Sequence, residues 1–366
     1  MRASLWLAVF ALSCAAGQLP ADNAKPAPEL DALFQRDSGW IGADGDYSVP
    51  LGGDKTVWLF SDSFVGKVID GRRTNAVMIH NSIALQHGQE RPEFFYGVTS
   101  DGKPDSFIKT IDGKGYYWIF AGTRTKAGLY FFLQQVETVD SKSVFGFKMT
   151  GTWLAEVANP EDPPAQWKIK QTKLPFCDFS GKGDLVFGSA LLRDGDYAYA
   201  YGVDGRKGNT RGRDGMVVAR VPADKFADFK EWRFLADGQW QQDWKRVTPL
   251  CGPMATEFSV TWLSGVKKFA AVTSEGLSGT IKLRLSPTPI GPWEKPAQIF
   301  ECPELKWPGK AFCYAAKAHP ELATAADELV ITYAANSWDF WQLFKDARLY
   351  WPRFVRFKVA AAPERI

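Results

Sequence analysis

Acidic side chains recur where short strand-like segments begin. Four such segments begin with Asp44, Asp105, Asp184 and Glu257, and a fifth begins with Tyr314. If the fold brings these strand starts to one mouth, several carboxyl groups share a pocket, where repulsion and unequal burial separate their pKa values. One carboxyl can then stay protonated while another is ionised. Hydrolysis of a glycosidic bond requires such a pair, one group as proton donor and one as base or nucleophile.

Each candidate acid also has a purely structural explanation. Asp44 precedes a glycine and could be a turn residue that bonds its own backbone. Asp46 shares a face with Asp44 if the strand is regular, so it is a second candidate. Glu257 begins an otherwise apolar strand, where a buried carboxylate is costly unless it is paired or used. Asp62 could cap a strand end, and Asp184 could be a loop acid.

Other side chains could contact a ligand at the same mouth. His319 could donate a hydrogen bond inside a channel or bind a central cation such as calcium, although a structural role is the simpler explanation. Arg72, Arg73 and Arg353 could contact hydroxyl or carboxylate groups, with salt bridges as the default alternative. Aromatic residues, Trp40 among them, would supply flat faces for sugar rings. The predicted substrate-binding residues are Asp184, His319, Arg73 and Trp40.

The elements that must position these residues are five similar stretches, each of which reads as a β-hairpin. Each has a polar start, a turn with glycine or acidic residues, and an aromatic-rich second strand. Successive copies are roughly 60 to 80 residues apart, somewhat above the ~40 to 50 of common propeller blades, as expected if long loops are inserted. The stretches are residues 44–62, 105–122, 184–202, 257–275 and 314–336.

Further strand-like segments follow each hairpin, so each copy has room for four strands. We predict an all-β fold, a five-bladed β-propeller with four-stranded antiparallel blades, formed by residues 35–360 as one domain. The last copy has only residues 349–360 behind it. Its missing outer strand could come from the N-terminal segment, which would close the ring. The 14% aromatic content and the 33 glycines suit packed sheets joined by many turns.

The N-terminus resembles a targeting signal. Arg2 precedes an apolar stretch at residues 5–12, and small residues follow it, so residues 1–17 are predicted to be a signal peptide. The apolar stretch is too short for a stable transmembrane helix. Residues 18–34 are rich in proline and alanine and are expected to form a flexible tether. The protein is thus expected in the periplasm or outside the cell, with acylation of Cys14 as a lipoprotein alternative.

Export would place the four remaining cysteines in an oxidising compartment. Four cysteines allow three pairings. The local pair is Cys302 with Cys313, which would leave Cys177 to pair with Cys251; buried free thiols are the alternative. No Cys-x-x-Cys motif occurs and the histidines are scattered, so no metal site of the zinc type is predicted.

Charge gives little indication of a macromolecular partner. The formal net charge is +3, and the charges of both signs are interspersed along the chain. Such a pattern does not indicate a nucleic-acid surface. We expect a monomer that binds a polysaccharide or oligosaccharide and needs no cofactor.

A family resemblance rests on several motifs in a fixed order. The segment WIGADGDYSVPLGGDKTVWLFSDSFVG, followed by HNSIAL, resembles the opening of exported bacterial proteins long labelled as domains of unknown function. The similarity continues through GDLVFGSALL, VARVPADKFADFKEW, TEFSVTWL, GPWEKPAQIFECPE and YAAKAHPEL. Those proteins resemble five-bladed propellers akin to glycoside hydrolase family 43, and some relatives are endo-acting D-arabinanases.

The resemblance implies a glycosidase-like site with an acid on the first blade and further acids on later blades. Asp44 matches the first-blade acid, Glu257 is the best match to a later one, and Asp62-Ser63 stands where relatives have Asp-Thr. We therefore predict Asp44 as base or nucleophile, Glu257 as proton donor and Asp62 as a residue that orients or tunes them. The implied function is hydrolysis of a polysaccharide, of arabinan type in some relatives. The alternative is a propeller without catalysis that binds glycan or protein.

Overall fold

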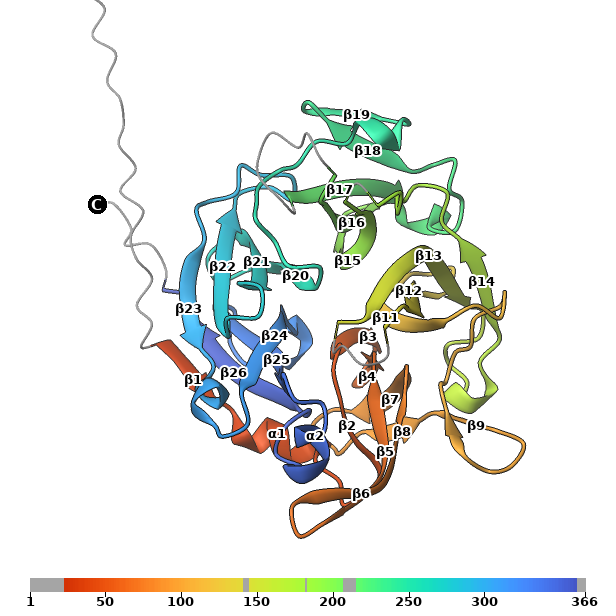
Figure 1. Ribbon diagram of the computed structural model, residues 1–366. Helices are drawn as coiled ribbons and strands as arrows, with labels where there is room; N and C mark the ends of the chain where they lie inside the picture. The colour runs from red at the N-terminus through yellow and green to blue at the C-terminus, as the bar shows by residue number, and fades with distance from the viewer. Residues whose placement is uncertain (1–22, 141–144, 182, 207–214, 361–366) are drawn as a thin grey trace, which may run out of the picture.

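A computed structural model describes residues 23–140, 145–181, 183–206 and 215–360. In this part of the chain, five antiparallel sheets of four or five strands surround a common centre (Figure 1). In four of these sheets the first strand in the chain lies nearest the centre and later strands follow outward, whereas in the fifth the N-terminal strand is outermost. The prediction of an all-β fold is confirmed. The predicted signal peptide and Cys14 lie outside the described residues.

The five sheets run in chain order around the ring. The first contains β3 (Tyr47–Gly52), β4 (Lys55–Phe60), β7 (Ser82–His87) and β8 (Glu93–Phe95). The second contains β11 (Tyr116–Arg124), β12 (Leu129–Thr138), β13 (Phe147–Val157) and β14 (Ile169–Lys173). The third contains β15 (Leu185–Asp194), β16 (Tyr197–Asp204), β17 (Gly215–Pro222), β18 (Arg233–Ala236) and β19 (Gln239–Gln241). The fourth contains β20 (Phe258–Leu263), β21 (Lys268–Ser274), β22 (Thr280–Ser286) and β23 (Ala297–Glu301). The fifth contains β24 (Ala311–Ala318), β25 (Glu328–Ser337), β26 (Pro352–Lys358) and β1 (Ala24–Pro26).

The hydrophobic core lies in the seams between neighbouring sheets. Strand β4 illustrates this, because alternate side chains of a strand point to opposite faces. Trp58 and Phe60 pack toward the fifth sheet, while Val57 and Leu59 pack toward the second. All four side chains are fully buried. A strand buried on both faces reads as a continuous apolar run, which is why the sequence of β4 does not alternate.

The N-terminal segment closes the fifth sheet and is not a flexible tether. Strand β1 pairs antiparallel with β26, so the outer strand missing from the last copy does come from the N-terminus. Helix α1 (Pro28–Phe34) follows at once, with proline in its first turn, a position that suits helix initiation. Phe34 is buried and its ring centroid lies 4.8 Å from that of Trp58. The tether prediction for residues 18–34 is therefore wrong from β1 onward, because Leu30 and Phe34 give α1 an apolar face.

The second of the five predicted hairpins is displaced by one strand. Residues 105–122 contain only the short β10 (Pro104–Asp105) and most of β11. The glycines at 113 and 115 have positive φ and end the loop that leads into β11. The partner of β11 is β12, which lies outside the predicted hairpin. Asp105 consequently pairs with Lys109 at the surface and is not at the start of an inner strand.

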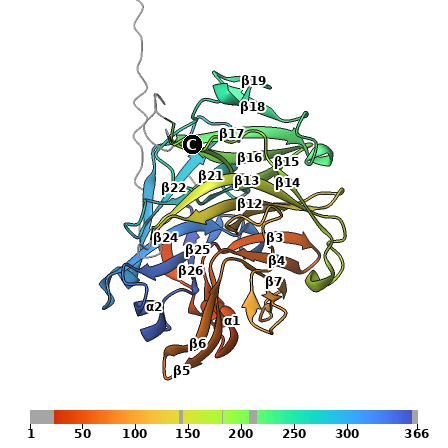
Figure 2. The ribbon, with the colours of Figure 1, turned by 45° about the vertical axis from the view of Figure 1, so that its right-hand side comes forward.

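Additional elements lie between the main strands. A separate three-stranded sheet joins β2 (Ser38–Ala43) to the hairpin of β5 (Ser63–Ile69) and β6 (Arg72–Ile79). Figure 2 shows β5 and β6 projecting from the ring beside α1 and α2 (Gln342–Lys345). The remaining short elements are β9 (Gly97–Val98), which pairs with β10, and 3-10 turns at Pro164–Gln166, Ala223–Lys225, Trp244–Arg246, Pro303–Lys306 and Pro320–Leu322. Among the described residues, no helix is long and apolar enough to cross a membrane.

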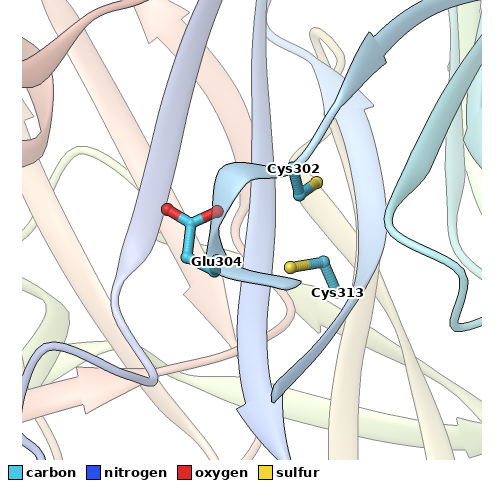
Figure 3. Close-up of side chains that lie close together, drawn as sticks. All are labelled: Cys302, Glu304 and Cys313. Atoms are coloured by element: carbon cyan, nitrogen blue, oxygen red, sulfur yellow. The ribbon is translucent and has the colours of Figure 1, made fainter. Parts of the chain in front are cut away.

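The local cysteine pair lies at the junction of the fourth and fifth sheets. Figure 3 shows Cys302, just after β23, beside Cys313 of β24, with Glu304 close by. Both thiols are buried and no disulfide joins them in this structure. The ligand atoms of the three side chains lie within 4.8 Å of one another. The Cys302–Cys313 disulfide therefore stays a prediction. Cys177 packs with a different core cluster from Cys251, and no disulfide joins that pair either.

Candidate active site

A large cavity opens where four of the five inner strands begin. Its volume is about 1070 Å³. Asp44 precedes β3, Tyr116 and Trp118 begin β11, Glu257 precedes β20, and Tyr314 lies near the start of β24. The structure therefore brings together three acids predicted from the sequence. They are Asp44, Asp62 and Glu257.

Backbone hydrogen bonds hold Asp44 and Asp62 side by side. The amide of Asp44 donates to the carbonyl of Asp62 at 3.2 Å, and the amide of Ser61 donates to the carbonyl of Asp44 at 2.9 Å. Gly45 has a φ of +91°, and a Cβ there would lie 2.7 Å from the amide nitrogen of Ser61. Only glycine fits this contact, so the sequence Asp-Gly after β2 fixes the first carboxyl next to the end of β4.

Two tyrosines hold the carboxyl group of Asp44. The hydroxyls of Tyr314 and Tyr350 both donate to Oδ2, the latter at 2.9 Å, while Oδ1 has no partner among the described residues. Burial raises the pKa of Asp44 well above its usual value, and the nearby carboxylates of Asp62 and Glu257 raise it further. The two phenol donors oppose this shift without cancelling it. The Asp44 carboxyl group is therefore harder to ionise than an ordinary aspartate.

Asp62 is held by a histidine and a tryptophan. Its Oδ1 lies 2.9 Å from Nδ1 of His80 and accepts a hydrogen bond of 3.0 Å from Nε1 of Trp118. The imidazole of His80 stacks on Tyr116 with a centroid distance of 3.6 Å. These contacts fix the direction in which the Asp62 carboxylate faces the cavity. The charge of Asp62 raises the pKa of Asp44. Its role in orienting or tuning the other acids stays a prediction.

Glu257 is paired with a buried lysine. The ammonium of Lys317 lies 3.3 Å from Oε1 of Glu257 and is 1% exposed. It also donates to the carbonyls of Gly45 and Ala315, and it lies 4.3 Å from the ring centroid of Tyr47. Lys317 thus joins the entry of the first sheet to the entry of the fourth. Glu257 is partly buried, and the cation beside it compensates its charge.

Asp46 is the most isolated acid of the cluster. It is fully buried, and neither carboxyl oxygen has a hydrogen-bond partner among the described residues. Burial raises its pKa to about 8, the charge of Lys317 opposes that rise, and the charge of Glu257 adds to it. The folded protein therefore binds a proton at Asp46 that the unfolded chain releases near its ordinary value of 3.8.

This shift predicts a pH-dependent stability that an Asp46→Asn variant would remove. Between about pH 4 and 8 the folded state holds more protons than the unfolded state, so the Asp46 contribution to stability falls as pH rises. Asparagine keeps the shape and tolerates the φ of 48° at this position. We expect the variant to unfold at higher urea concentration than the wild type at pH 8, with the difference shrinking toward pH 4. An equal difference at both pH values would contradict the assigned titration.

None of the four predicted substrate-binding residues lines this cavity. Trp40 is buried in the core, donates to Ser82 Oγ at 3.0 Å and stacks on Phe94. Arg73 is also buried, and its guanidinium donates to three backbone carbonyls, at Ile41, Leu343 and Leu349. The guanidinium therefore holds β2 against the segment that begins with α2. Arg73 does not line the cavity. Asp184 precedes β15, and the third sheet contributes no residue to this cavity.

His319 lies toward the opposite end of the channel. It lines a second cavity of about 320 Å³, formed where the inner strands end. Nδ1 lies 2.6 Å from Ser48 Oγ, and Nε2 lies 2.6 Å from Thr332 Oγ1. Burial lowers the pKa of His319 well below its usual value, so the ring is neutral. A central cation at His319 would have to replace one of these two hydroxyl partners.

Sequence reasoning missed several residues that complete the site. Lys317 stands in the otherwise apolar segment FCYAAKAH, and the argument used for Glu257, a charge in a buried strand, would have found it. His80, just after β6, and Trp118, in β11, carry hydrogen-bonding groups beside apolar strand residues, and this could have marked them as candidates. Tyr350 carries no local signal, because 306 positions separate it from the carboxyl group it contacts.

Solved structures with a similar fold include glycoside hydrolases. A candidate hydrolase from Bacteroides ovatus ATCC 8483 superposes with a TM-score of 0.72 at 21% identity, over 91% of this chain and 89% of that one. The GH43_1 enzyme from Xanthomonas citri, solved with xylotriose, gives a TM-score of 0.50 at 12% identity, over 92% and 95%. RS223-β-xylosidase gives 0.50 at 13%, over 93% and 96%. At these identities the likeness shows the fold alone.

Comparison at the level of sequence gives one family. The sequence profile described as "Domain of unknown function (DUF5005)" matches residues 28–359. No curated protein matches the chain significantly. The matched range begins at the start of α1 and ends just after β26, so it contains every strand of the five sheets except β1.

Proposed function

Because this chain belongs to the DUF5005 family and shares its fold with family 43 glycoside hydrolases, we propose that it is a glycoside hydrolase that cleaves a polysaccharide. The observation that carries the proposal is the shared cavity of Asp44, Glu257 and Asp62, three carboxyl groups from separate elements. Hydrolysis of a glycosidic bond needs two carboxyl groups at one pocket, one as proton donor and one as base or nucleophile.

The protonation states suggest which carboxyl does which step. Burial raises the pKa of Asp44 and so favours its protonated form, and its Oδ1 has no competing partner among the described residues. Glu257 is the carboxylate beside the Lys317 ammonium. We therefore assign Asp44 as the proton donor to the leaving oxygen and Glu257 as the base or nucleophile. This reverses the roles expected from the sequence. Burial favours the protonated form of Asp44, and the Lys317 ammonium favours the ionised form of Glu257, whereas the resemblance implied Asp44 as the base or nucleophile.

Arabinan-type polysaccharides are the first substrates to test, since the motifs resemble those of proteins related to endo-acting D-arabinanases. Xylan follows, because the similar Xanthomonas citri structure was solved with xylotriose. The test is release of new reducing ends from a panel of polysaccharides by residues 18–366, with the Asp44→Asn variant as the control for contaminating activity. Cleavage by the wild type alone supports the proposal. Binding without cleavage by any panel member would favour the alternative, a propeller that only binds glycan.

The finer features of the fold and location belong to the same proposal. We take each of the five sheets as one blade of a five-bladed propeller, closed by β1 on the outer side of the fifth blade. The proposed protein is monomeric and exported to the periplasm or beyond, with residues 1–17 as its signal peptide. Detection of the mature protein in the cytoplasm after expression of the full chain would contradict export.

A further inference from the structure

The rim of the large cavity carries exposed aromatic side chains on one rigid turn. Trp338, just after β25, is 50% exposed, and Trp341, just before α2, is 64% exposed. Both line the cavity. The turn between them is braced, because Asp339 N donates to Ser337 Oγ at 3.0 Å and Trp341 N donates to Asp339 Oδ1 at 3.1 Å. Large apolar surfaces held exposed in this way mark binding sites more often than they serve stability.

An aromatic wall leads from this rim to the reacting carboxyl. Trp338 packs on Phe312 at a centroid distance of 4.9 Å, and Phe312 packs on Tyr314 at 5.6 Å. The hydroxyl of Tyr314 donates to Asp44. The wall is therefore continuous from solvent to the site of bond cleavage. A ligand that follows it must be long, with flat apolar faces along its length.

The charges in the cavity limit what that ligand can be. Among the residues that the structure describes, five acids line it and no lysine or arginine does, so these side chains would repel an anionic chain. The inner acids already have donors from the protein: Trp118 and His80 at Asp62, Lys317 at Glu257 and two phenols at Asp44. A cationic ligand would therefore have to compete with a donor already bonded to each of these three acids. The polar groups that remain are suited to hydroxyls.

We propose that the cavity binds an uncharged oligosaccharide chain, whose outer sugar rings pack on Trp338 and Trp341 while an inner glycosidic bond lies at Asp44 and Glu257. The proposal rests on the proposed function for the position of the scissile bond. It adds a substrate class and an outer binding site that extends the contact beyond the bond being cleaved.

The test measures binding separately from cleavage. Calorimetric titration of the Asp44→Asn protein uses three probes: uncharged arabino- and xylo-oligosaccharides, anionic oligogalacturonate and cationic chitosan oligosaccharide. We expect binding only for an uncharged chain. Trp338→Ala and Trp341→Ala should each weaken it about tenfold, the loss of roughly one aromatic contact. Trp262→Ala is the matched control, because this tryptophan is 45% exposed but lines the cavity at the opposite end.

The outcomes separate this inference from the function on which it rests. Tightest binding to a charged chain, or unchanged affinity in both rim variants, would overturn the inference. Cleavage of a charged polysaccharide by the wild type would do the same while supporting the hydrolase. Binding of an uncharged chain that depends on the two tryptophans, without cleavage by the wild type, would support the inference and contradict the hydrolase.

Discussion

Replacement of Asp44 by asparagine is expected to lower polysaccharide cleavage by about 10² to 10⁴-fold, the usual contribution of a positioned acid or base. The amide oxygen can still accept from Tyr314 and Tyr350, so the local structure should be retained. The variant loses the group whose pKa burial raises, and with it the proton that the leaving oxygen needs. Rates of reducing-end release and an unchanged circular dichroism spectrum provide the measurement.

Two further variants define the roles of the carboxyl groups. If Asp44 is the donor, Asp44→Asn should retain activity on an aryl glycoside with a good leaving group, which needs no protonation. Glu257→Gln should lose that activity and regain turnover with azide. The opposite pattern would restore the roles expected from the sequence. Asp184→Asn is the matched control, because Asp184 does not line the cavity and should leave cleavage unchanged.

Replacement of Lys317 by methionine is expected to lower the free energy of unfolding by about 1 to 3 kcal/mol, the usual cost of leaving a buried hydrogen-bonding group without its partner. Methionine nearly fills the same volume but supplies no charge to Glu257 and no donor to the carbonyls of Gly45 and Ala315. The field of Lys317 at Asp46 is lost as well. Urea unfolding at pH 7, followed by tryptophan fluorescence, measures the change.

A double variant shows whether the loss is electrostatic. At pH 9, above the pKa of about 8 of Asp46, addition of Asp46→Asn to Lys317→Met removes one of the two ionised acids that the lysine compensates. We expect the pair to be less destabilised than the sum of the single changes, since the two sites interact directly. A loss below about 1 kcal/mol for Lys317→Met would be no larger than that of a surface ion pair. It would contradict the stabilising role assigned to Lys317 between the first and fourth sheets.

The order of the strands was predictable because each inner hairpin carries its own pattern. Residues 44–62, 184–202, 257–275 and 314–336 each contain the two strands that pair in the structure. The copy at residues 105–122 was displaced because its loop before β11 contains turn glycines that resemble a hairpin turn. Local patterns report which residues prefer strands, and they do not report which strand is the partner.

The N-terminal segment also shows that local sequence patterns do not identify the partner of a strand. Proline and alanine after residue 17 are typical of a tether, and strand counting alone suggested that this segment completes the last sheet. Both statements draw on the same residues. Pairing of β1 with β26 decided between them, because the unpaired edge of β26 and the buried site for Phe34 exist only once the ring has formed.

The sequence by itself determined that this protein is all-β and that Asp44 and Glu257 stand at the entries of inner strands. Only the tertiary structure decided which polar groups meet there, Lys317 with Glu257 and Tyr350 with Asp44. It also decided that Arg73 and Trp40 lie within the core. The physical reason is that strand position follows from local alternation, whereas burial and electrostatic partners depend on contacts between residues hundreds of positions apart. Those contacts set the protonation of Asp44, on which the proposed chemistry depends.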